Sequence, residues 1–144
     1  MYKIPVSVLV VIHTIDLQVL LLERADHPGY WQSVTGSQDP GETLLQTAMR
    51  EISEETGLSS VDYELTDWQI ENRYEIYQEW RWRYGPDVRF NTEHVFGLCL
   101  PGVTPVRISA REHLNYVWLP WQQAAEQVFS SSNADAILNL PAHM

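Results

Sequence analysis

The feature that most constrains the fold of this chain is the stretch GSQDPGETLLQTAMREISEETGL, residues 36 to 58, which predicts one helix with both ends marked. Thr43 and Gln46 match the capping box, in which two side chains satisfy free backbone amides at a helix start. Gly57 followed by Leu58 is typical of a helix end in which glycine takes the left-handed conformation. The sequence therefore predicts a helix that begins after Thr43 and ends before Gly57.

One face of this helix is apolar, and a stripe of carboxylates borders it. At about 100° per residue, the apolar side contains Leu45, Ala48, Met49, Ile52 and Thr56. Glu51, Glu54 and Glu55 are three and four positions apart, so they gather on a neighbouring stripe. Glu55 lies nearest the apolar edge.

Three carboxylates on one turn have two interpretations. A solvated acidic face is the ordinary one. However, like charges four residues apart are mildly destabilising, and these lie near a helix C-terminus, where the macrodipole disfavours negative charge. A divalent cation such as Mg²⁺ would remove both penalties, because it binds carboxylate oxygens and is often completed by substrate phosphates. The pattern favours a cation site.

The rest of the chain predicts an α+β domain with a mixed sheet. Extended segments are expected at 5–13, 18–24, 33–35, 93–102 and 112–120, with two more within 65–85. Helices are expected at 121–129 and 133–140. No linker-like stretch divides the sequence, so residues 1–144 are expected to form one domain, a sandwich of a sheet between helices.

Composition excludes several classes of protein. A formal net charge of −10 disfavours nucleic-acid binding. The apolar run near the start is too short to span a membrane, and no signal peptide is visible there. The single cysteine, Cys99, prevents an intrachain disulfide and is expected to be buried in a strand, which fits a cytoplasmic location. None of the five histidines has zinc-ligand spacing.

With its preceding loop, the helix contains a specific motif. Gly36, five residues, Glu42, seven residues and then REISEETGL match G-x5-E-x7-R-E-U-x-E-E-x-G-U, where U is aliphatic. These nine fixed positions in twenty-three are the Nudix box, so the chain resembles the Nudix hydrolases. The resemblance implies an α/β/α sandwich with the loop-helix-loop of the family. It also implies Mg²⁺- or Mn²⁺-dependent hydrolysis of a nucleoside diphosphate linked to another group.

The resemblance assigns roles to the residues of the box. The Gly36 carbonyl and the carboxylates of Glu51, Glu54 and Glu55 are expected to bind metal. Arg50 and Glu42 are expected to orient the helix and the loop. The alternative is an ordinary surface salt bridge, which would contribute little to stability. Gly57 is a structural position of the box.

A further glutamate outside the box is expected to bind metal or to act as general base. Glu112 is our choice, because it precedes a histidine and an aromatic-rich strand, and Glu93 is the rival. The alternative for either is a charge at the end of a loop. The predicted catalytic set is therefore Arg50, Glu54, Glu55 and Glu112.

Short pieces outside the box are similar to a bacterial branch of the family that acts on dihydroneopterin triphosphate and has also been described as hydrolysing dATP. They include LLERADHPGYWQSVTGS, YEIYQEWRWRYGP, NTEHVF and EHLNYVWL. The similarity implies hydrolysis to dihydroneopterin monophosphate and pyrophosphate. The expected substrate contacts are Lys3, Arg24, Trp31, Thr35, Tyr74, Tyr77 and Ser130, with Arg81 or Arg83 as further cations. For any one aromatic, core packing is the alternative, and the serines 130–132 could be plain loop if Asn133 caps the last helix.

Other functions remain open at this point. A nucleoside triphosphate pyrophosphohydrolase acting on dATP would use the same chemistry. A dinucleoside polyphosphate hydrolase would instead release a nucleoside triphosphate. A binding module without catalysis is disfavoured, because every carboxylate of the box is present. The sequence contains no feature that fixes the oligomeric state, although the aromatic run 80–84 could form an interface.

Overall fold

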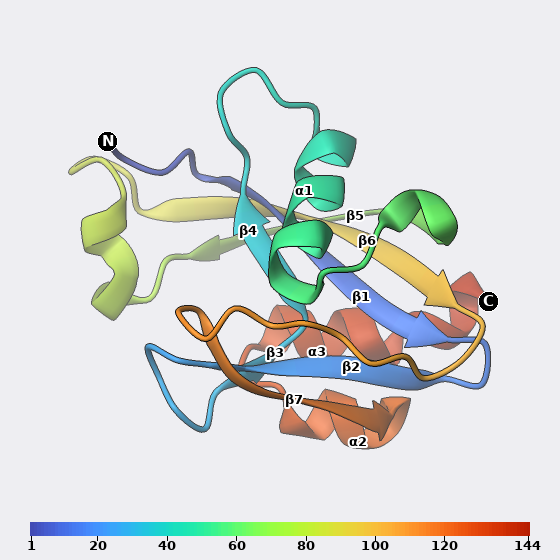
Figure 1. Cartoon of the computed structure of the whole chain (residues 1–144). Helices are drawn as coiled ribbons and strands as arrows, with labels where there is room; N and C mark the ends of the chain where they lie inside the picture. Colours follow the sequence, from blue (N-terminus) through green and yellow to red (C-terminus); the bar gives the residue numbers. More distant parts are fainter.

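The structure is a computed structural model that describes residues 1–144, and it contains a mixed sheet between helical layers (Figure 1). The strands are β1 (Val6–Thr14), β2 (Gln18–Arg24), β3 (Trp31–Gln32), β4 (Val34–Ser37), β5 (Glu64–Glu75), β6 (Phe90–Leu100) and β7 (His113–Pro120). The α-helices are α1 (Leu44–Thr56), α2 (Trp121–Gln127) and α3 (Ser131–Leu138). Short 3-10 helices are η1 (Ser60–Asp62), η2 (Gln78–Arg83) and η3 (Leu140–His143).

The central strand β1 organises the sheet. It pairs in parallel with β6 along its whole length and antiparallel with β4 and β2. The main strand order is β3-β2-β1-β6-β5, with β4 on β1 and β7 on β2, so all seven strands belong to one sheet. The predicted mixed sheet is confirmed.

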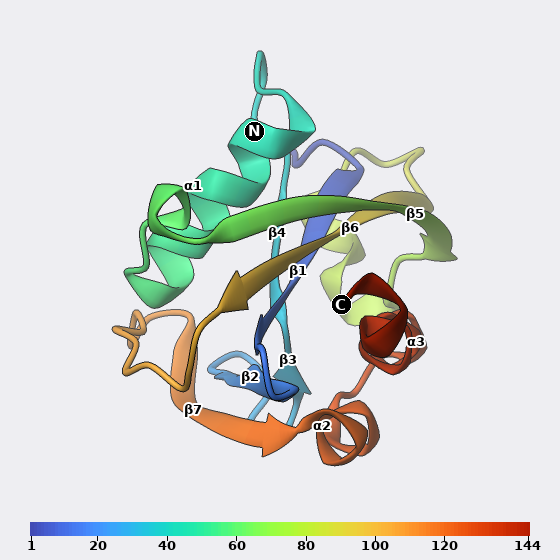
Figure 2. The same ribbon diagram turned by 90° about the vertical axis from the view of Figure 1, so that its right-hand side faces the viewer.

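Both faces of β1 are buried, because helices cover the sheet on both sides. Val8, Val10 and Ile12 pack toward α1, together with Ala48 and Ile52 of that helix. The alternate residues Leu9 and Val11 pack with Ala124, Ala136 and Ile137 of α2 and α3. Successive side chains of a strand point to opposite faces, so an unbroken apolar run supplies two cores. Figure 2 shows α1 and the pair α2 and α3 on opposite sides of the strands. The α/β/α sandwich is confirmed.

Helix α1 has the predicted ends. The Thr43 hydroxyl accepts from the Gln46 amide at 3.1 Å, and the Thr43 amide donates to the Gln46 side chain at 2.9 Å. Gly57 has φ 73°, a conformation that costs glycine little, and its amide donates to the Ser53 carbonyl. The prediction for Leu45 was wrong: it is exposed, and Thr47 takes the buried position instead.

Residues 65–85 differ from the sequence prediction. The first part forms the long strand β5, but the second part is the 3-10 helix η2 and not a strand. The alternating polarity of the sequence did not predict the 3-10 helix, because contacts with distant residues determine its position. Trp80 packs against Phe129, and the Arg24 guanidinium lies over the Trp80 ring. Cys99 lies in β6 as expected but is only half-buried.

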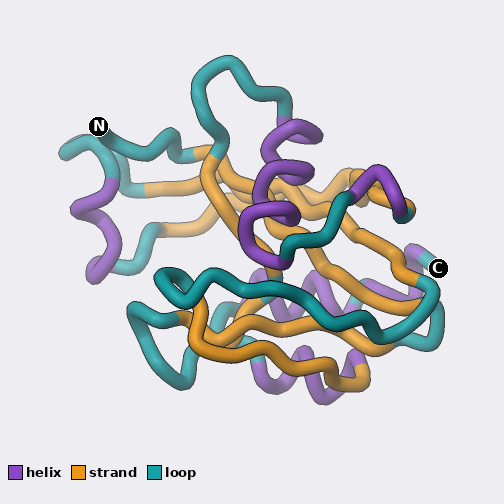
Figure 3. Tube along the Cα trace, viewed as in Figure 1, coloured by secondary structure: helices purple, strands orange, loops and turns teal.

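A long loop, residues 101–112, links β6 to β7 and passes the C-terminal end of α1 (Figure 3). The Arg107 amide donates to the Thr56 carbonyl at 2.8 Å, which fixes the loop to the last turn of α1. This course brings Glu112 near the carboxylates of the helix. No helix is both long enough and apolar enough to cross a membrane.

Candidate active site

Arg50 joins the loop before α1 to the helix. Its Nε donates to Glu42 Oε2 at 2.6 Å, and its Nη2 donates to Glu42 Oε1 at 3.0 Å. The same Nη2 donates to the Ser37 carbonyl at 2.9 Å. The bonds from Arg50 are the main reason why the pKa of Glu42 falls to about 2. This bidentate, charge-assisted pair fixes the loop relative to the helix.

Glu51 and Glu55 lie on the buried side of α1. Glu51 is 9% exposed and Glu55 is 2% exposed. Strand β4 passes so close that a Cβ placed on Gly36 would lie 2.1 Å from the Cδ of Glu51. The Glu51 carboxylate therefore rests against the backbone of β4, where only glycine leaves room for it.

The other acidic candidates separate into three places. Glu54 points outward, with its side chain 53% exposed and an oxygen 3.2 Å from Arg50 Nη1. Glu112 is the last residue of the long loop and lines the same cavity as Glu51 and Glu55. Glu93 instead lines a neighbouring cavity. The position of Glu112 supports it over Glu93 as the additional carboxylate.

Burial perturbs the two inner carboxyls. It raises the pKa of Glu51, and it raises the pKa of Glu55 well above its usual range. Contact with Glu51 and the charge of Glu112 raise the Glu55 pKa further. His113 Nε2 lies 3.6 Å from Glu55 Oε1, but burial, followed by the charge of Arg24, lowers the pKa of His113 to about 4. The imidazole is therefore neutral at pH 7 and does not neutralise Glu55.

These donors fit a hard divalent cation. Carboxylate and carbonyl oxygens are its preferred ligands, and Glu55 Oε1 is buried without any hydrogen-bond partner. A bound cation would offset the repulsion that raises the Glu55 pKa. No three of the acidic side chains lie close enough together to bind one ion as they stand. One oxygen of Glu51 instead accepts a hydrogen bond from Arg50 Nη1 at 2.6 Å.

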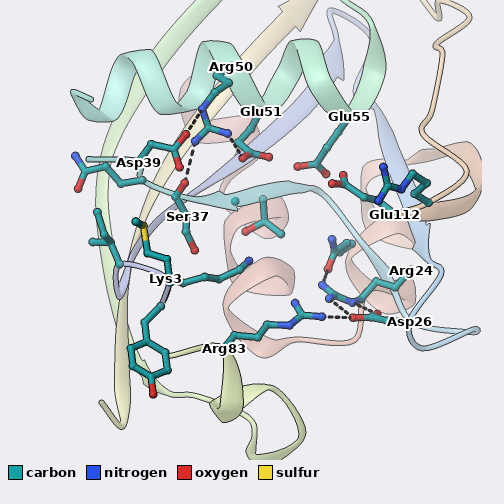
Figure 4. Close-up of a pocket in the computed structure, with 18 of the residues that line it drawn as sticks. Lys3, Arg24, Asp26, Ser37, Asp39, Arg50, Glu51, Glu55, Arg83 and Glu112 are labelled. Carbon is teal, nitrogen blue, oxygen red and sulfur yellow. Dashed lines mark hydrogen bonds and ion pairs between the residues drawn. The ribbon is translucent and has the colours of Figure 1, made fainter. Parts of the chain in front are cut away.

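A basic wall faces the carboxylates across a cavity of about 870 Å³. Figure 4 shows Glu51, Glu55 and Glu112 on one side and Lys3, Arg24 and Arg83 on the other. Asp26 links the two arginines, with oxygens 2.7 Å from Arg24 Nε and 3.0 Å from Arg83 Nη2. Cations opposite a cluster of carboxylates suit a polyphosphate whose charge is shared between metal and protein.

An aromatic slot opens beside this cavity. It has a volume of about 160 Å³ and contains Tyr74, Tyr77, Trp80, Tyr84 and Phe129. The slot and the larger cavity share four wall residues: Arg24, Gln32, Thr35 and Arg83. Because the two spaces adjoin, one ligand can place a flat ring in the slot and its phosphates in the cavity.

The structure brings most of the predicted substrate contacts to these two spaces. Lys3, Arg24, Thr35, Tyr74, Tyr77 and Ser130 all line one or both of them. Trp31 is the exception: it lines neither space and packs, partly buried, against the core that contains residues of α2 and α3. Arg83 lines both, whereas Arg81 lines neither.

The cap of α3 differs from the alternative in which Asn133 would cap this helix. Ser130, and not Asn133, is the N-cap, because the Ser130 hydroxyl accepts from the Asn133 amide at 3.3 Å. The Asn133 side chain instead accepts from the Ser33 amide and donates to its hydroxyl. This buried pair joins the start of α3 to the strand region next to β4.

Several site residues were missed by sequence reasoning. Trp80, Phe129 and Gln32 line the slot, and Arg111 lines the cavity. Arg111 had a local signal, since it precedes Glu112. Trp80 and Phe129 had none beyond their aromatic character, because they meet through packing between segments far apart in the chain.

The box geometry and the sandwich define a class of protein. A model of the NUDIX domain matches residues 3–140, and the chain belongs to the Nudix family. Enzymes of this family in general use divalent metal cations.

The proteins most similar over the whole chain include two bacterial enzymes. The chain is 47% identical over 139 residues to the dihydroneopterin triphosphate diphosphatase of Escherichia coli (strain K12), covering 94% of this chain and 91% of that protein. It is 40% identical to the protein of the same name from Haemophilus influenzae, covering 94% of this chain and 87% of that protein. The solved structure of the E. coli dihydroneopterin triphosphate pyrophosphohydrolase superposes with a TM-score of 0.94 at 44% identity, covering 100% and 99% of the two chains. An Ap4A hydrolase structure from C. elegans shares the fold, with a TM-score of 0.75 at 20% identity over 96% of each chain.

The family and these relatives make the chain a pyrophosphohydrolase, as the box predicted.

Proposed function

We propose that this protein hydrolyses dihydroneopterin triphosphate to dihydroneopterin monophosphate and pyrophosphate, with Mg²⁺ or Mn²⁺ as cofactor. The observation that carries the proposal is that the cavity and the aromatic slot adjoin and share four wall residues. Together these spaces provide a place for a triphosphate and, beside it, a place for a flat bicyclic ring. Identity of 47% to a protein that bears this activity in its name supports the choice of substrate.

The metal would be held by the carboxylates of Glu51, Glu55 and Glu112, with the Gly36 carbonyl as a further ligand. When bound, it neutralises phosphate charge and lowers the pKa of the attacking water. Glu54 would have to turn inward from its contact with Arg50 to join these ligands. Lys3, Arg24 and Arg83 lie opposite and balance the remaining charge of the phosphates.

Hydrolysis breaks the anhydride between the α- and β-phosphates. A new bond forms from the water oxygen to phosphorus, the P–O bond to the bridging oxygen breaks, and pyrophosphate leaves. The proton of the water needs a positioned acceptor, and a carboxylate oxygen of Glu51, Glu55 or Glu112 that does not bind the metal would take it. The Arg50–Glu42 pair holds the loop in a fixed position relative to the helix during the reaction.

The test is product identification by phosphorus NMR. Purified protein with Mg²⁺ is incubated separately with dihydroneopterin triphosphate, dATP and a dinucleoside polyphosphate, and chelated samples serve as controls. Pyrophosphate released fastest from the pterin supports the proposal. Faster release from dATP would reassign the enzyme to nucleotide-pool control, and inorganic phosphate as the first product would refute the reaction.

The proposal places the protein in the cytoplasm, acting on a small molecule. The acidic net charge of −10 argues against nucleic acid as substrate, and the single cysteine suits a reducing compartment.

A further inference from the structure

A carboxylate lies in the wall of the aromatic slot. Glu93 belongs to β6, between Ser7 of β1 and Asn72 of β5 in the sheet register, and is 4% exposed. Its Oε1 lies 3.5 Å from Asn72 Nδ2, which is a long hydrogen bond. The reaction described above gives this side chain no role.

Glu93 is poorly compensated for such a buried acid. The groups that favour its charged form are the Ser132 hydroxyl and the Asn72 amide, and no cation is among them. Burial raises the pKa of the Glu93 carboxyl, and no nearby cation offsets this effect. A buried carboxylate without a strong partner costs stability, so its presence in a cavity wall points to a partner that arrives with the ligand.

The chemistry of the partner follows from the carboxylate. An ionised carboxylate accepts hydrogen bonds only, and its two oxygens match two parallel N–H donors. The pyrimidine ring of a pterin presents such an edge, with the N3–H beside the 2-amino group. Adenine presents a ring nitrogen acceptor beside its amino group, which would set a lone pair against one carboxylate oxygen.

The slot also adjoins the space for the rest of the ligand. The slot and the phosphate cavity share Arg24, Thr35 and Arg83, so a ligand with its phosphates in the cavity can place its ring in the slot, where Glu93 forms part of the wall. Tyr77 and Phe129 line the same slot. Aromatic side chains provide the contact area for a flat ring, while a polar group fixes its orientation.

We infer that Glu93 is the specificity-determining residue of the slot and that its carboxylate binds the N3–H and 2-amino groups of the pterin ring. The inference rests on the proposed function and names the part of the substrate that the slot selects.

The first test uses the unaltered protein and two rings of the same shape. Pterin carries the 2-amino group, and lumazine carries a 2-oxo group in its place. Calorimetric titration without metal should show pterin binding about tenfold or more tighter than lumazine, as expected for loss of a charge-assisted hydrogen bond. Equal affinities would refute the inference.

The second test compares Glu93→Gln with Glu71→Gln. Glu71 lies on the adjacent strand β5, is exposed and loses the same charge. Glu93→Gln should raise the KM for dihydroneopterin triphosphate about 10- to 100-fold with little change in kcat. It should also reduce the ratio of the affinity for pterin to the affinity for lumazine. Glu71→Gln should leave both unchanged.

The outcomes separate this inference from the function on which it rests. If the unaltered protein releases no pyrophosphate from dihydroneopterin triphosphate, the proposed function fails. If it turns over this substrate but Glu93→Gln has the same KM, the function stands and the role of Glu93 is refuted. Glutamine is nearly isosteric and removes a buried charge, so the melting temperature of Glu93→Gln should not fall below that of the unaltered protein, and it is measured alongside.

Discussion

Replacing Gly36 with alanine tests the close contact between β4 and the Glu51 carboxylate. The added Cβ would lie 2.1 Å from Glu51 Cδ, and real Cβ contacts essentially never fall below 3.0 Å. The carboxylate must therefore move by about 0.9 Å or more, the difference between these two distances. A misplacement of about 1 Å at a catalytic group costs on the order of 100-fold in rate. We expect Gly36→Ala to reduce kcat/KM by about that factor.

Stability should change much less than activity. Moving Glu51 weakens its bond to Arg50, a partly exposed ion pair worth about 1 kcal/mol, which corresponds to a fall of about 3 °C in melting temperature. The assay is pyrophosphate release at several substrate concentrations, together with thermal unfolding. Gly102→Ala is the matched control, because nothing lies within 4 Å of a Cβ there. If Gly36→Ala keeps kcat/KM within threefold of that control, the contact does not position Glu51 and the argument is refuted.

Four further substitutions test other parts of the structure. Glu54→Gln and Glu55→Gln should each lower turnover by orders of magnitude in the pyrophosphate assay while the circular dichroism spectrum is unchanged; near-normal activity in both would contradict the metal assignment. The pKa of Asp26 is lowered to about 2, chiefly by its bond to Arg24, so its contribution to stability is complete above pH ~3.8 and is lost as the pH falls toward ~2. Asp26→Asn should reduce stability at pH 7 by about 1 kcal/mol, since a third of the side chain is exposed, and the loss should vanish in acid unfolding near pH 2. Ile52→Ala should cost about 2–5 kcal/mol in denaturant unfolding, because Ile52 is fully buried against β1, and a cost below 1 kcal/mol would contradict the packing described.

The sequence predicted the local features of the site well. The ends of α1 depend on contacts between residues at most four positions apart, so Thr43, Gln46 and Gly57 were sufficient to predict them. The stripe of glutamates was likewise fixed by helical geometry, and Glu55 lies at the buried edge as predicted.

Features that depend on distant segments were not predicted. A helical wheel cannot show that Arg50 turns Glu54 outward, because the outcome depends on where Ser37 and Glu42 lie. The 3-10 helix η2 has the same polarity pattern as a strand, and its contact with Phe129, about fifty residues later, orients it. Trp31 was assigned to the substrate because it is aromatic, and its packing against the core that contains residues of α2 and α3 could be seen only in the fold.

The two adjoining spaces share Arg24, Gln32, Thr35 and Arg83, but most of their other residues come from different parts of the chain. The cleavage side alone uses α1 and the start of β7, whereas the slot alone uses β5 and the start of α3. Substitutions in the second group can therefore exchange one ring for another while the residues that break the anhydride stay in place. New substrates can arise in this scaffold by altering residues 74–80 and 129–133, with no loss of the hydrolytic step during the change.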